Sequence, residues 1–531
     1  MVGLPAAALS RLCEAVTRRT LNIVGAVTTP TLKQRTSGIL LHATSLPGPH
    51  GSGDLGTEAR AFAEFLARAG QRWWQMLPIG PAGYGDSPYS ALSAFAGNPM
   101  LIDLDGLGVA IDDEALPADF VDFARAGRYR ERHLRRAFAA FRPTKEYDAF
   151  CVREQRWLDD WALYAALKRA HGDVEWTKWE PGVRDRKKDA LSKARNDLAE
   201  EIAFHRFVQF RFDSQWNDLR VYCNARGIGL IGDLPIFVAH DSADVWQNRE
   251  LFHLDDEGMP TVIAGVPPDY FSATGQRWGN PQYRWDRLKE TRYRWWVDRF
   301  ATALARFDAI RLDHFIGFVR SWHIPRTEPT AMNGTWVPGP GRALFDAVKD
   351  AVGELPLVAE DLGLVTKEVS RLRRDLGLPG IRLVQFAFGT DPQAPKFKPH
   401  AHGRRSVVYT GTHDNDTIVG WYFDRGGGED STRTPEEAEK ERHHALAYLG
   451  REEWMPTAQE LAWAMIRLTL SSVAHTVILP MQDVLALGSE ARMNRPGKAT
   501  GNWRWRMEAG ANEGHLERKL HEATACYGRA P

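Results

Sequence analysis

The chain of 531 residues lacks the features that mark disulfide scaffolds, membrane proteins and nucleic-acid binders. Its four cysteines, Cys13, Cys151, Cys223 and Cys526, are far apart and form no C-x-x-C pair. This spacing excludes a disulfide framework or a zinc ribbon and favours a reducing compartment. No run of about 18 apolar residues is present that could span a membrane. Lys plus Arg and Asp plus Glu number 68 each, so the formal charge is +0, which removes the usual electrostatic case for nucleic acid or an anionic membrane as a partner.

No Gly-x-Gly-x-x-Gly or Walker loop follows a predicted strand, which weakens any nucleotide-binding interpretation. The chain instead alternates short apolar runs, typical of buried strands, with stretches of helical spacing. Strands are predicted at residues 38–42, 72–77, 229–235, 381–386 and 476–481, and in the apolar runs before Asp313, Glu360 and Asp414. Repeated βα units imply a parallel sheet, and more than six strands favour a closed (β/α)8 TIM barrel with helical insertions.

Helix boundaries are also predicted from local signals. A helix should run from Thr57 to Ala69 and stop at Gly70, another should begin at a Thr366 cap, and Thr457 with Glu460 forms a capping box. Residues from about 105 to 195 are rich in charge and keep apolar positions at helical spacing, so we expect a helical insertion there.

Residues 1–36 are predicted to be an N-terminal extension, and residues 37–531 to form the barrel. Met1 to Gln34 is rich in Ala, Thr and Arg, with Glu14 as its only acid. Such a segment is either a dispensable extension or an organelle transit peptide. We expect a cytoplasmic protein, with a plastid as the alternative if residues 1–34 are a transit peptide.

Three carboxylates, Asp313, Glu360 and Asp414, each lie just past an apolar run. In a (β/α)8 barrel the C-terminal strand ends carry the active site, built from several different strands. A pair of carboxyl groups, one protonated and one ionised, is what cleavage of a glycosidic bond requires. The sequence therefore predicts a site that processes sugars.

The neighbours of each acid favour different roles. Arg311 lies two residues before Asp313, so on a strand both side chains share a face, where a guanidinium favours an ionised carboxylate. Glu360 has no basic neighbour in sequence and follows apolar residues, which favours a desolvated carboxylic acid. His413 beside Asp414 offers a donor to a sugar hydroxyl.

These segments resemble a known family. Arg311-Leu-Asp313, Glu360 and His413-Asp414 are similar, in this order, to three segments of the α-amylase superfamily. Longer motifs narrow the resemblance to the amylomaltases, 4-α-glucanotransferases also called disproportionating enzymes; they span residues 41–48, 83–89, 232–238, 241–246, 265–272, 274–280 and 334–341. The resemblance runs from about Ser37 to Trp505. Too few residues follow Trp505 for the C-terminal β-sandwich domain of amylases, which agrees with amylomaltases.

The resemblance implies that Asp313 is the nucleophile, Glu360 the acid/base and Asp414 the transition-state stabiliser of a retaining transfer between α-1,4-glucans. Substrate contacts are implied for Tyr84, Ser87, Tyr89, Asp233, Asp269, Tyr270, Phe271, Gln276, Trp278, Arg311, His314, His413 and Asn494. The implied partners are maltooligosaccharides and amylose, starch or glycogen chains, not nucleic acid or membrane, with the protein a monomer or small homo-oligomer. No metal or organic cofactor is expected, because carboxylates suffice for this chemistry. One departure is Ile316, where many family members carry Arg, and we expect it to affect only fine substrate preference.

A lid loop is predicted at about residues 265–280. Pro267-Pro268 stiffens its entry, Gly275 and Gly279 permit hinge dihedrals, and Tyr270 and Phe271 offer apolar faces. A lid that excludes water from a covalent intermediate would favour a sugar hydroxyl over water as the acceptor.

Two alternatives remain open beside the transferase. An α-glucan hydrolase on the same barrel would differ only in its acceptor. A catalytically dead glucan-binding module would lack at least one of the three acids, and all are present. For a retaining mechanism, the carboxyl groups of Asp313 and Glu360 should lie roughly 5–5.5 Å apart.

Overall fold

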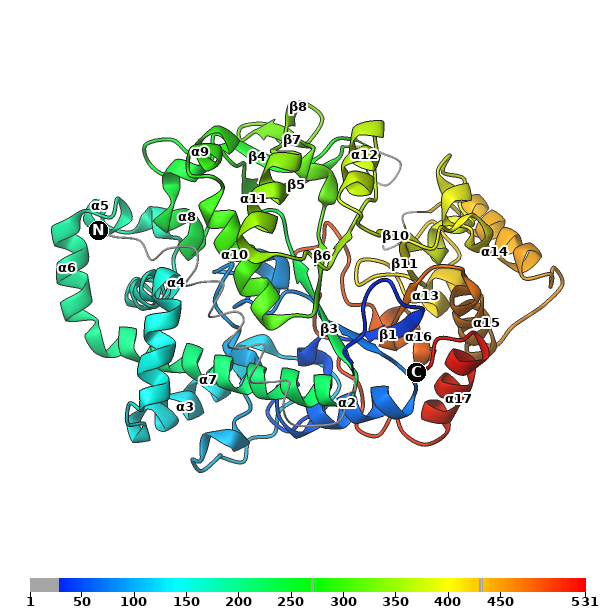
Figure 1. The fold of residues 1–531 in the computed structure, drawn as a ribbon, viewed down its shortest axis with the longest axis horizontal. Helices are drawn as coiled ribbons and strands as arrows, with labels where there is room; N and C mark the ends of the chain where they lie inside the picture. The colour runs from blue at the N-terminus through cyan, green and yellow to red at the C-terminus, as the bar shows by residue number, and fades with distance from the viewer. Residues whose placement is uncertain (1–27, 269–271, 273, 429–430, 432) are drawn as a thin grey trace.

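Eight parallel strands form a closed barrel in the computed structural model, which describes residues 28–268, 272, 274–428, 431 and 433–531 (Figure 1). In barrel order the strands are β1 (Thr36–Leu40), β2 (Trp73–Gln75), β3 (Gly229–Leu234), β6 (Ala309–Leu312), β9 (Leu357–Ala359), β10 (Gly380–Leu383), β11 (Ser406–Tyr409) and β12 (Thr476–Pro480). β12 pairs with β1 from Thr36–Thr476 to Leu40–Pro480 and closes the ring. The predicted (β/α)8 barrel is confirmed.

The interior of the barrel is packed around Trp73, which is 1% exposed. In the strand register Gly38 of β1 and Gly229 of β3 lie opposite Trp73 from both sides. A Cβ at Gly38 would lie 2.4 Å from the Trp73 Cβ, and one at Gly229 would lie 2.5 Å from the indole ring. Both glycines therefore make room for a large side chain inside a close-packed barrel.

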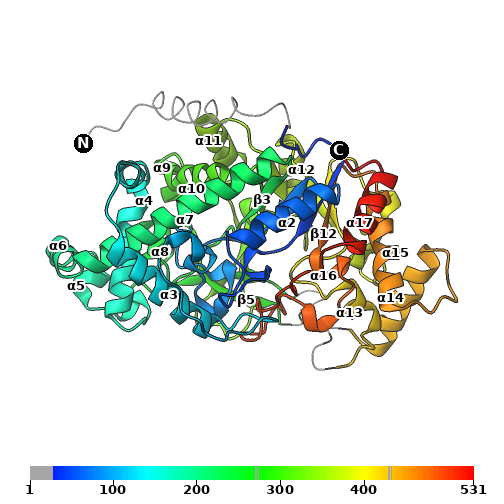
Figure 2. The ribbon, with the colours of Figure 1, turned by 90° about the horizontal axis from the view of Figure 1, so that it is seen from below.

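Helices form the outer layer of the barrel (Figure 2): α2 (Thr57–Arg68), α7 (Ala199–Ala225), α10 (Arg294–Arg306), α11 (Arg342–Val352), α12 (Lys367–Asp375), α13 (Ile418–Phe423) and α15 (Ala458–Ser471). Farther out, at the edge of the molecule, lies α14 (Pro435–Tyr448). The predicted caps are confirmed. Thr366 accepts the Val369 N–H at the start of α12, and Thr457 with Glu460 forms a capping box on α15. After β12 the described regular elements are helical: α16 (Met481–Val484), a 3₁₀ turn at Ser489–Ala491 and α17 (His515–Cys526).

The charged stretch from 105 to 195 lies between β2 and β3 and contains four α-helices in the described chain. They are α3 (Phe123–Ala140), α4 (Lys145–Ala170), α5 (Pro181–Arg184) and α6 (Lys188–Asp197), grouped at one end of the molecule (Figure 1). α4 packs against the long barrel helix α7. None of the described helices is both long and apolar enough to cross a membrane.

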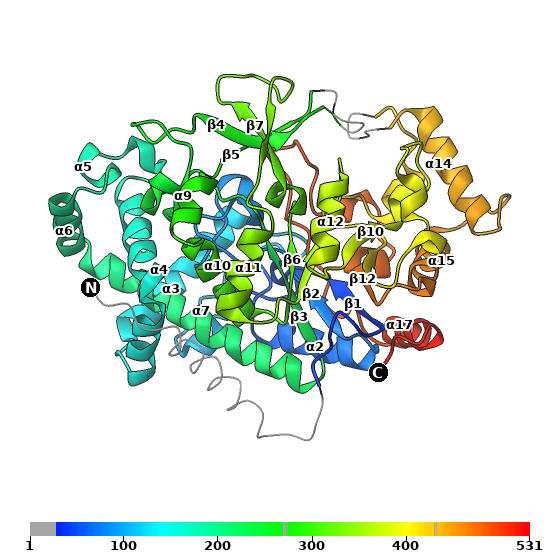
Figure 3. The ribbon, with the colours of Figure 1, turned by 45° about the horizontal axis from the view of Figure 1, so that its top comes forward.

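A second, antiparallel sheet of four strands lies over one side of the barrel (Figure 3). Its order is β5-β4-β7-β8, with β4 (Val262–Val266), β5 (Gln276–Pro281), β7 (Arg320–Pro325) and β8 (Thr335–Pro338). The chain enters it twice, once after β3 and once after β6. The prediction of a loop throughout 265–280 is therefore wrong at both ends, where the residues belong to strands β4 and β5. Its two ends are strands, because β4 pairs with β5 on one side and with β7 on the other, and the ladder satisfies their backbone groups.

Arg529, which follows α17, fastens the C-terminal segment to the end of the barrel opposite the strand C-termini. Its side chain is fully buried and donates hydrogen bonds of 2.7–3.1 Å to five backbone carbonyls: those of Thr36, Leu470, Ser472, Ala474 and His475. One guanidinium thus joins the start of β1 to the turn between α15 and β12.

We expect Arg529→Met to lower the free energy of unfolding by about 3 kcal/mol, because buried carbonyls lose charge-assisted hydrogen bonds. The measurement is a denaturant or thermal unfolding curve of the full chain. Arg518→Met, at an exposed position of α17, is the matched control and should change little. Equal losses in the two variants would contradict the assignment of Arg529 as a fastener.

Candidate active site

Arg311 on β6 is the centre of a charged network at the C-terminal end of the barrel. Its Nη1 donates to Asp233 Oδ2 at 2.6 Å and lies 3.1 Å from Asp313 Oδ1. The Tyr89 hydroxyl donates to the same Asp233 oxygen at 2.8 Å. Burial alone would lower the pKa of Arg311, but Asp233, and after it Tyr89 and Asp313, raise this pKa well above its ordinary value. The guanidinium is therefore a permanent positive charge beside the candidate nucleophile.

The strand register brings Asp313 and Glu360 together. Leu312 of β6 lies opposite Ala359 of β9, so the next residue on each strand, Asp313 or Glu360, continues the same alignment. The Glu360 N–H donates to the Leu312 carbonyl at 3.1 Å, which extends the ladder past the strand end. Neighbouring strands are about 4.8 Å apart, so the barrel itself places the two acids side by side.

Glu360 lies in an environment that favours its protonated form. Burial raises the pKa of Glu360 to about 8; Arg311 opposes this shift and Asp313 reinforces it. One of its oxygens, Oε2, accepts the His314 N–H at 2.6 Å. His314 itself has a left-handed backbone, with φ 48°, an uncommon conformation for a residue other than glycine. The second oxygen can therefore carry a transferable proton.

Asp414, on the loop after β11, is held in the opposite protonation state. Burial would raise the pKa of Asp414, but His413 and Asn494 lower it far below the ordinary value. Asn494 Nδ2 donates to Oδ1 at 2.6 Å, and His413 Nε2 lies 3.4 Å from Oδ2. One titratable group is thus held as an acid and another as a carboxylate, a separation typical of catalytic sites.

Aromatic rings form one wall of the site beside Asp414. The rings of Tyr89 and His413 are stacked with centroids 5.0 Å apart, and Trp503 lies 5.9 Å from both. Trp503 has φ 66°, an unfavourable backbone conformation for a bulky side chain. Its backbone N–H donates to the Met493 carbonyl at 2.6 Å. Asn494 follows Met493 in the same segment, so this strained turn adjoins the residue that holds Asp414.

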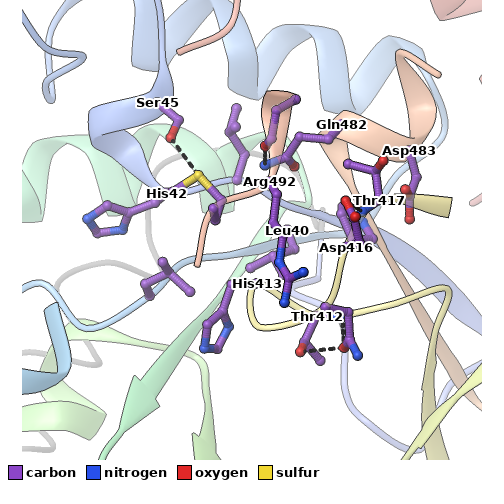
Figure 4. A pocket seen from close by; sticks show the side chains of 16 residues that line it. Leu40, His42, Ser45, Thr412, His413, Asp416, Thr417, Gln482, Asp483 and Arg492 are labelled. Atoms are coloured by element: carbon purple, nitrogen blue, oxygen red, sulfur yellow. Dashed lines mark hydrogen bonds between the residues drawn. The ribbon is translucent and has the colours of Figure 1, made fainter. Parts of the chain in front are cut away.

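A small pocket lies behind His413, between the ends of β1, β11 and β12. Figure 4 shows His42 and His413 toward one side of it, and Asp416, Thr417 and Asp483 toward the other. Its remaining lining includes Arg492 and apolar side chains of the strand ends. The loop that carries Asp414 and the ends of the neighbouring barrel strands both contribute to its lining.

On the other side of the acids, Trp278 of β5 forms an accessible aromatic surface. Its side chain is 38% exposed, its ring meets His314 edge to face at 4.8 Å, and Phe237 lies 6.2 Å away. Trp278 Nε1 donates to Gln276 Oε1 at 3.2 Å. Burial lowers the pKa of His314 to about 4, so its imidazole is neutral near pH 7. Such a ring with polar neighbours suits the apolar face and hydroxyls of a sugar.

The remaining predicted contacts are placed differently. Ser87 accepts the Tyr89 N–H at 3.2 Å and so fixes the turn that presents Tyr89. Tyr84 is 78% exposed, so most of this residue is open to solvent. Ile316 is 2% exposed and packs in the core, so its position presents no charge to the site. Asp269, Tyr270 and Phe271 lie outside the described residues, and their contacts stay predictions.

Sequence reasoning missed several residues that contribute to the site. Phe237 packs against Trp278 and His314, Trp503 against Tyr89 and His413, and His42 lines the pocket behind His413. Phe237 and His42 lie in motifs that the sequence analysis named, and each closely follows a barrel strand, so this position could have identified them. No comparable sequence pattern marks Trp503, which lies in a loop far along the chain. Within the described part of the chain, no three His, Cys, Asp or Glu side chains gather in a metal-binding cluster.

Two carboxyl groups at the ends of adjacent strands, a third on the loop after β11 and the aromatic surface beside them are typical of a carbohydrate-active barrel. The chain belongs to the 4-alpha-glucanotransferase family, glycoside hydrolase family 77, whose model matches residues 41–512. The predicted amylomaltase resemblance is confirmed, and with it the class of enzyme.

Similar proteins span the whole barrel. A 4-alpha-glucanotransferase of Thermus thermophilus is 49% identical over 511 residues, covering 92% of this chain and 99% of that protein. A chloroplastic/amyloplastic 4-alpha-glucanotransferase of Solanum tuberosum is 39% identical over 519 residues, covering 93% and 87%. Among solved structures, the amylomaltase from Streptococcus agalactiae in complex with acarbose has a TM-score of 0.87 and 36% identity, covering 94% of this chain and all of that one.

The protonation of Glu360 can be measured directly. The infrared band of a protonated carboxyl group should persist as pH rises and fade near pH 8, and it should be missing in Glu360→Gln. Because the folded protein binds this proton more tightly than the unfolded chain, the group's contribution to stability falls from about pH 4.5 to about pH 8. Glu360→Gln carries no charge, so its stability relative to wild type should rise across that window. A band already lost at pH 6 would contradict the assignment.

Proposed function

We propose that this chain transfers α-1,4-glucan segments between maltooligosaccharides by a retaining double displacement through a covalent glycosyl-Asp313 intermediate. The observation that carries the proposal is the pairing of two neighbouring carboxyl groups in different states. Asp313 is ion-paired to Arg311 at 3.1 Å, whereas the pKa of Glu360 is raised to about 8. An ionised nucleophile beside a protonated acid is what the first step requires.

In the first half-reaction a carboxylate oxygen of Asp313 attacks the anomeric carbon of the donor glucan. Glu360 gives its proton to the glycosidic oxygen as that bond breaks, and the reducing-end fragment leaves with a new hydroxyl. Positive charge develops on the sugar ring during the step, and the low pKa of Asp414 keeps a carboxylate there to stabilise it. Arg311 and Asp233 bind the cleaved unit in this assignment.

In the second half-reaction Glu360, now a carboxylate, accepts the proton of an incoming 4-hydroxyl. The acceptor oxygen attacks the anomeric carbon, the bond to Asp313 breaks, and a new α-1,4 linkage forms. Each step inverts the configuration of the anomeric carbon, so the two steps together retain it. The proton returns to Glu360, so the enzyme is regenerated without any other reagent.

Acceptor choice distinguishes this transfer from hydrolysis. Water competes at roughly 55 M, but well-oriented bound groups reach effective molarities of about 10⁵ M or more. Trp278 and Gln276, on the strand of the second sheet that follows the lid segment, are the residues we assign to acceptor binding. Asp269, Tyr270 and Phe271 complete this acceptor side in the proposal, with Tyr84, Ser87 and Asn494 contacting neighbouring glucose units.

Relatives support the ligand class and leave the compartment open. The Streptococcus agalactiae amylomaltase was solved with acarbose, which supports a sugar ligand for the homologous site. We propose maltooligosaccharides and longer amylose, starch or glycogen chains as donors and acceptors. The cytoplasm is the proposed location, and a plastid is the alternative because the Solanum tuberosum relative is chloroplastic/amyloplastic.

Glu360→Gln should lower turnover by at least about 10²–10⁴-fold, the usual contribution of general acid/base catalysis. The loss should be this large because one carboxyl group serves both half-reactions. Steady-state rates on maltotriose measure it, and a circular dichroism spectrum checks that the fold is unchanged. A variant that keeps more than about a tenth of the wild-type rate would remove Glu360 from the acid/base role.

With maltotriose as sole substrate, free glucose and a ladder of longer maltosides should appear together while total reducing ends stay constant. Each transfer breaks one glycosidic bond and makes another, so no reducing end is gained. Chromatography of the products and a reducing-end assay measure the two quantities. Reducing ends that climb in step with glucose would replace the transferase with the hydrolase alternative.

The same assay tests the acceptor side. Trp278→Ala should shift the balance toward hydrolysis, because the acceptor loses its aromatic platform and water enters more easily. Met332→Ala is the matched control, since Met332 is also exposed in the segment joining β7 to β8 of the same sheet. Equal product ratios in both variants would exclude Trp278 from acceptor binding.

A further inference from the structure

The loop from Thr410 to Thr417, which joins β11 to α13, carries both His413 and Asp414. A loop that presents a catalytic carboxylate must be held to within a fraction of an ångström, because small displacements are costly to catalysis. Thr412, His413 and Asp416 of this loop all line the pocket behind His413 (Figure 4). Atoms facing a cavity have no packing partners on that side. On the pocket side, the position of the loop therefore depends on hydrogen bonds.

The Asp483 carboxylate accepts a hydrogen bond from each end of this loop. It lies on α16, directly after the neighbouring barrel strand β12, and is 1% exposed. One carboxylate oxygen accepts the hydroxyl of Thr410, where the loop leaves β11. The other accepts the N–H of Ile418 at 2.7 Å, where α13 begins. A single rigid group thus sets the distance between the loop's two ends.

The apex of the loop is held from the same segment of chain. Residues 489–494 follow α16, and within them Arg492 donates to the Asp414 carbonyl at 2.8 Å. Asn494 donates from its backbone to the His413 carbonyl at 3.1 Å and from its side chain to the Asp414 carboxylate at 2.6 Å. Ser489 donates to the Asp416 carboxylate at 2.7 Å. Asp483 therefore anchors the base of the loop to the segment that also orients its tip.

We propose that Asp483 is a positioning residue for the transfer reaction, acting through Asp414 by hydrogen bonds that clamp the two ends of the 410–417 loop. The inference rests on the proposed function, in which Asp414 stabilises the transition state. Asp483 has no role in binding the sugar directly; its effect is on where the Asp414 carboxylate lies when charge develops. Loosening the clamp should therefore lower kcat more than it changes KM, because the transition state depends on that position more than the ground state does.

Three substitutions separate geometry from charge. Asp483→Leu has a similar size and no hydrogen-bonding group, so it should lower kcat by roughly 10- to 100-fold with little change in KM. Asp483→Asn can still accept the Ile418 N–H and can donate to the Thr410 hydroxyl, so its kcat should stay within about threefold of wild type. Thr410→Val removes only one bond with almost no change of shape and should give a smaller loss. It also serves as the test if Asp483→Leu does not fold.

A matched control lies at the other end of the barrel. Asp308 also ties two segments together, accepting the Leu230 N–H at 2.9 Å and Arg220 at 2.8 Å, but it precedes β6. Asp308→Leu should lower the thermal midpoint without changing kcat of the folded protein. If Asp308→Leu and Asp483→Leu lower kcat equally, or if Asp483→Leu keeps wild-type kcat, the positioning role is overturned.

A double-mutant cycle tests whether Asp483 acts through Asp414. Asp483→Leu combined with Asn494→Ala should cost less than the product of the two single losses, because both displace the same carboxylate. Multiplicative losses would mean independent effects and would overturn the inference. Asp414→Asn is measured alongside. Wild-type kcat in that variant would refute the proposed function itself, whereas an inactive Asp414→Asn with a fully active Asp483→Leu refutes only the clamp.

Discussion

The buried charge of Arg311 is the constraint around which the site is organised. A guanidinium enclosed at the mouth of a barrel is tolerated only when carboxylates compensate it, and here Asp233 and Asp313 do so from 2.6 and 3.1 Å. Asp233 is opposite Arg311 in the register of β3 and β6, so the compensation is part of the barrel's hydrogen-bond ladder. Through Asp233 the same charge orients Tyr89, whose ring stacks on His413. Asp313 and the aromatic wall beside Asp414 are therefore both oriented by the charge of Arg311.

The barrel contributes different degrees of rigidity to the three acids. Asp313 and Glu360 directly follow strands and are fixed by the backbone ladder between β6 and β9. Asp414 lies farther from its strand and depends on side-chain hydrogen bonds from Asn494 and on backbone contacts from the same segment. The backbone ladder thus sets the positions of Asp313 and Glu360, whereas neighbouring loops set the position of Asp414.

The sequence predicted local and periodic features well. Spacing of two residues placed Arg311 beside Asp313, and apolar runs with caps located the barrel strands and the starts of α12 and α15. It could not predict contacts between distant strands from spacing, so the Tyr89–Asp233–Arg311 network depended on the family resemblance. The antiparallel sheet was missed because β4 and β7 belong to separate insertions, and their pairing satisfies backbone groups that no local pattern links. No sequence pattern pointed to Asp483, because the groups that it binds, at Thr410 and Ile418, lie more than sixty residues earlier in the chain.

The contacts of Arg529 determine where a fusion partner or a support attached to the C-terminal segment would lie relative to the active site. Its guanidinium bonds the carbonyl of Thr36, so the first barrel strand and the C-terminal segment meet on the face opposite the catalytic strand ends. A surface linker, a fusion partner or a solid support joined at the C-terminal end would emerge away from the glucan entrance. The same proximity makes the barrel a candidate for circular permutation, in which a short peptide bridges these two segments and new ends are opened in an exposed loop elsewhere.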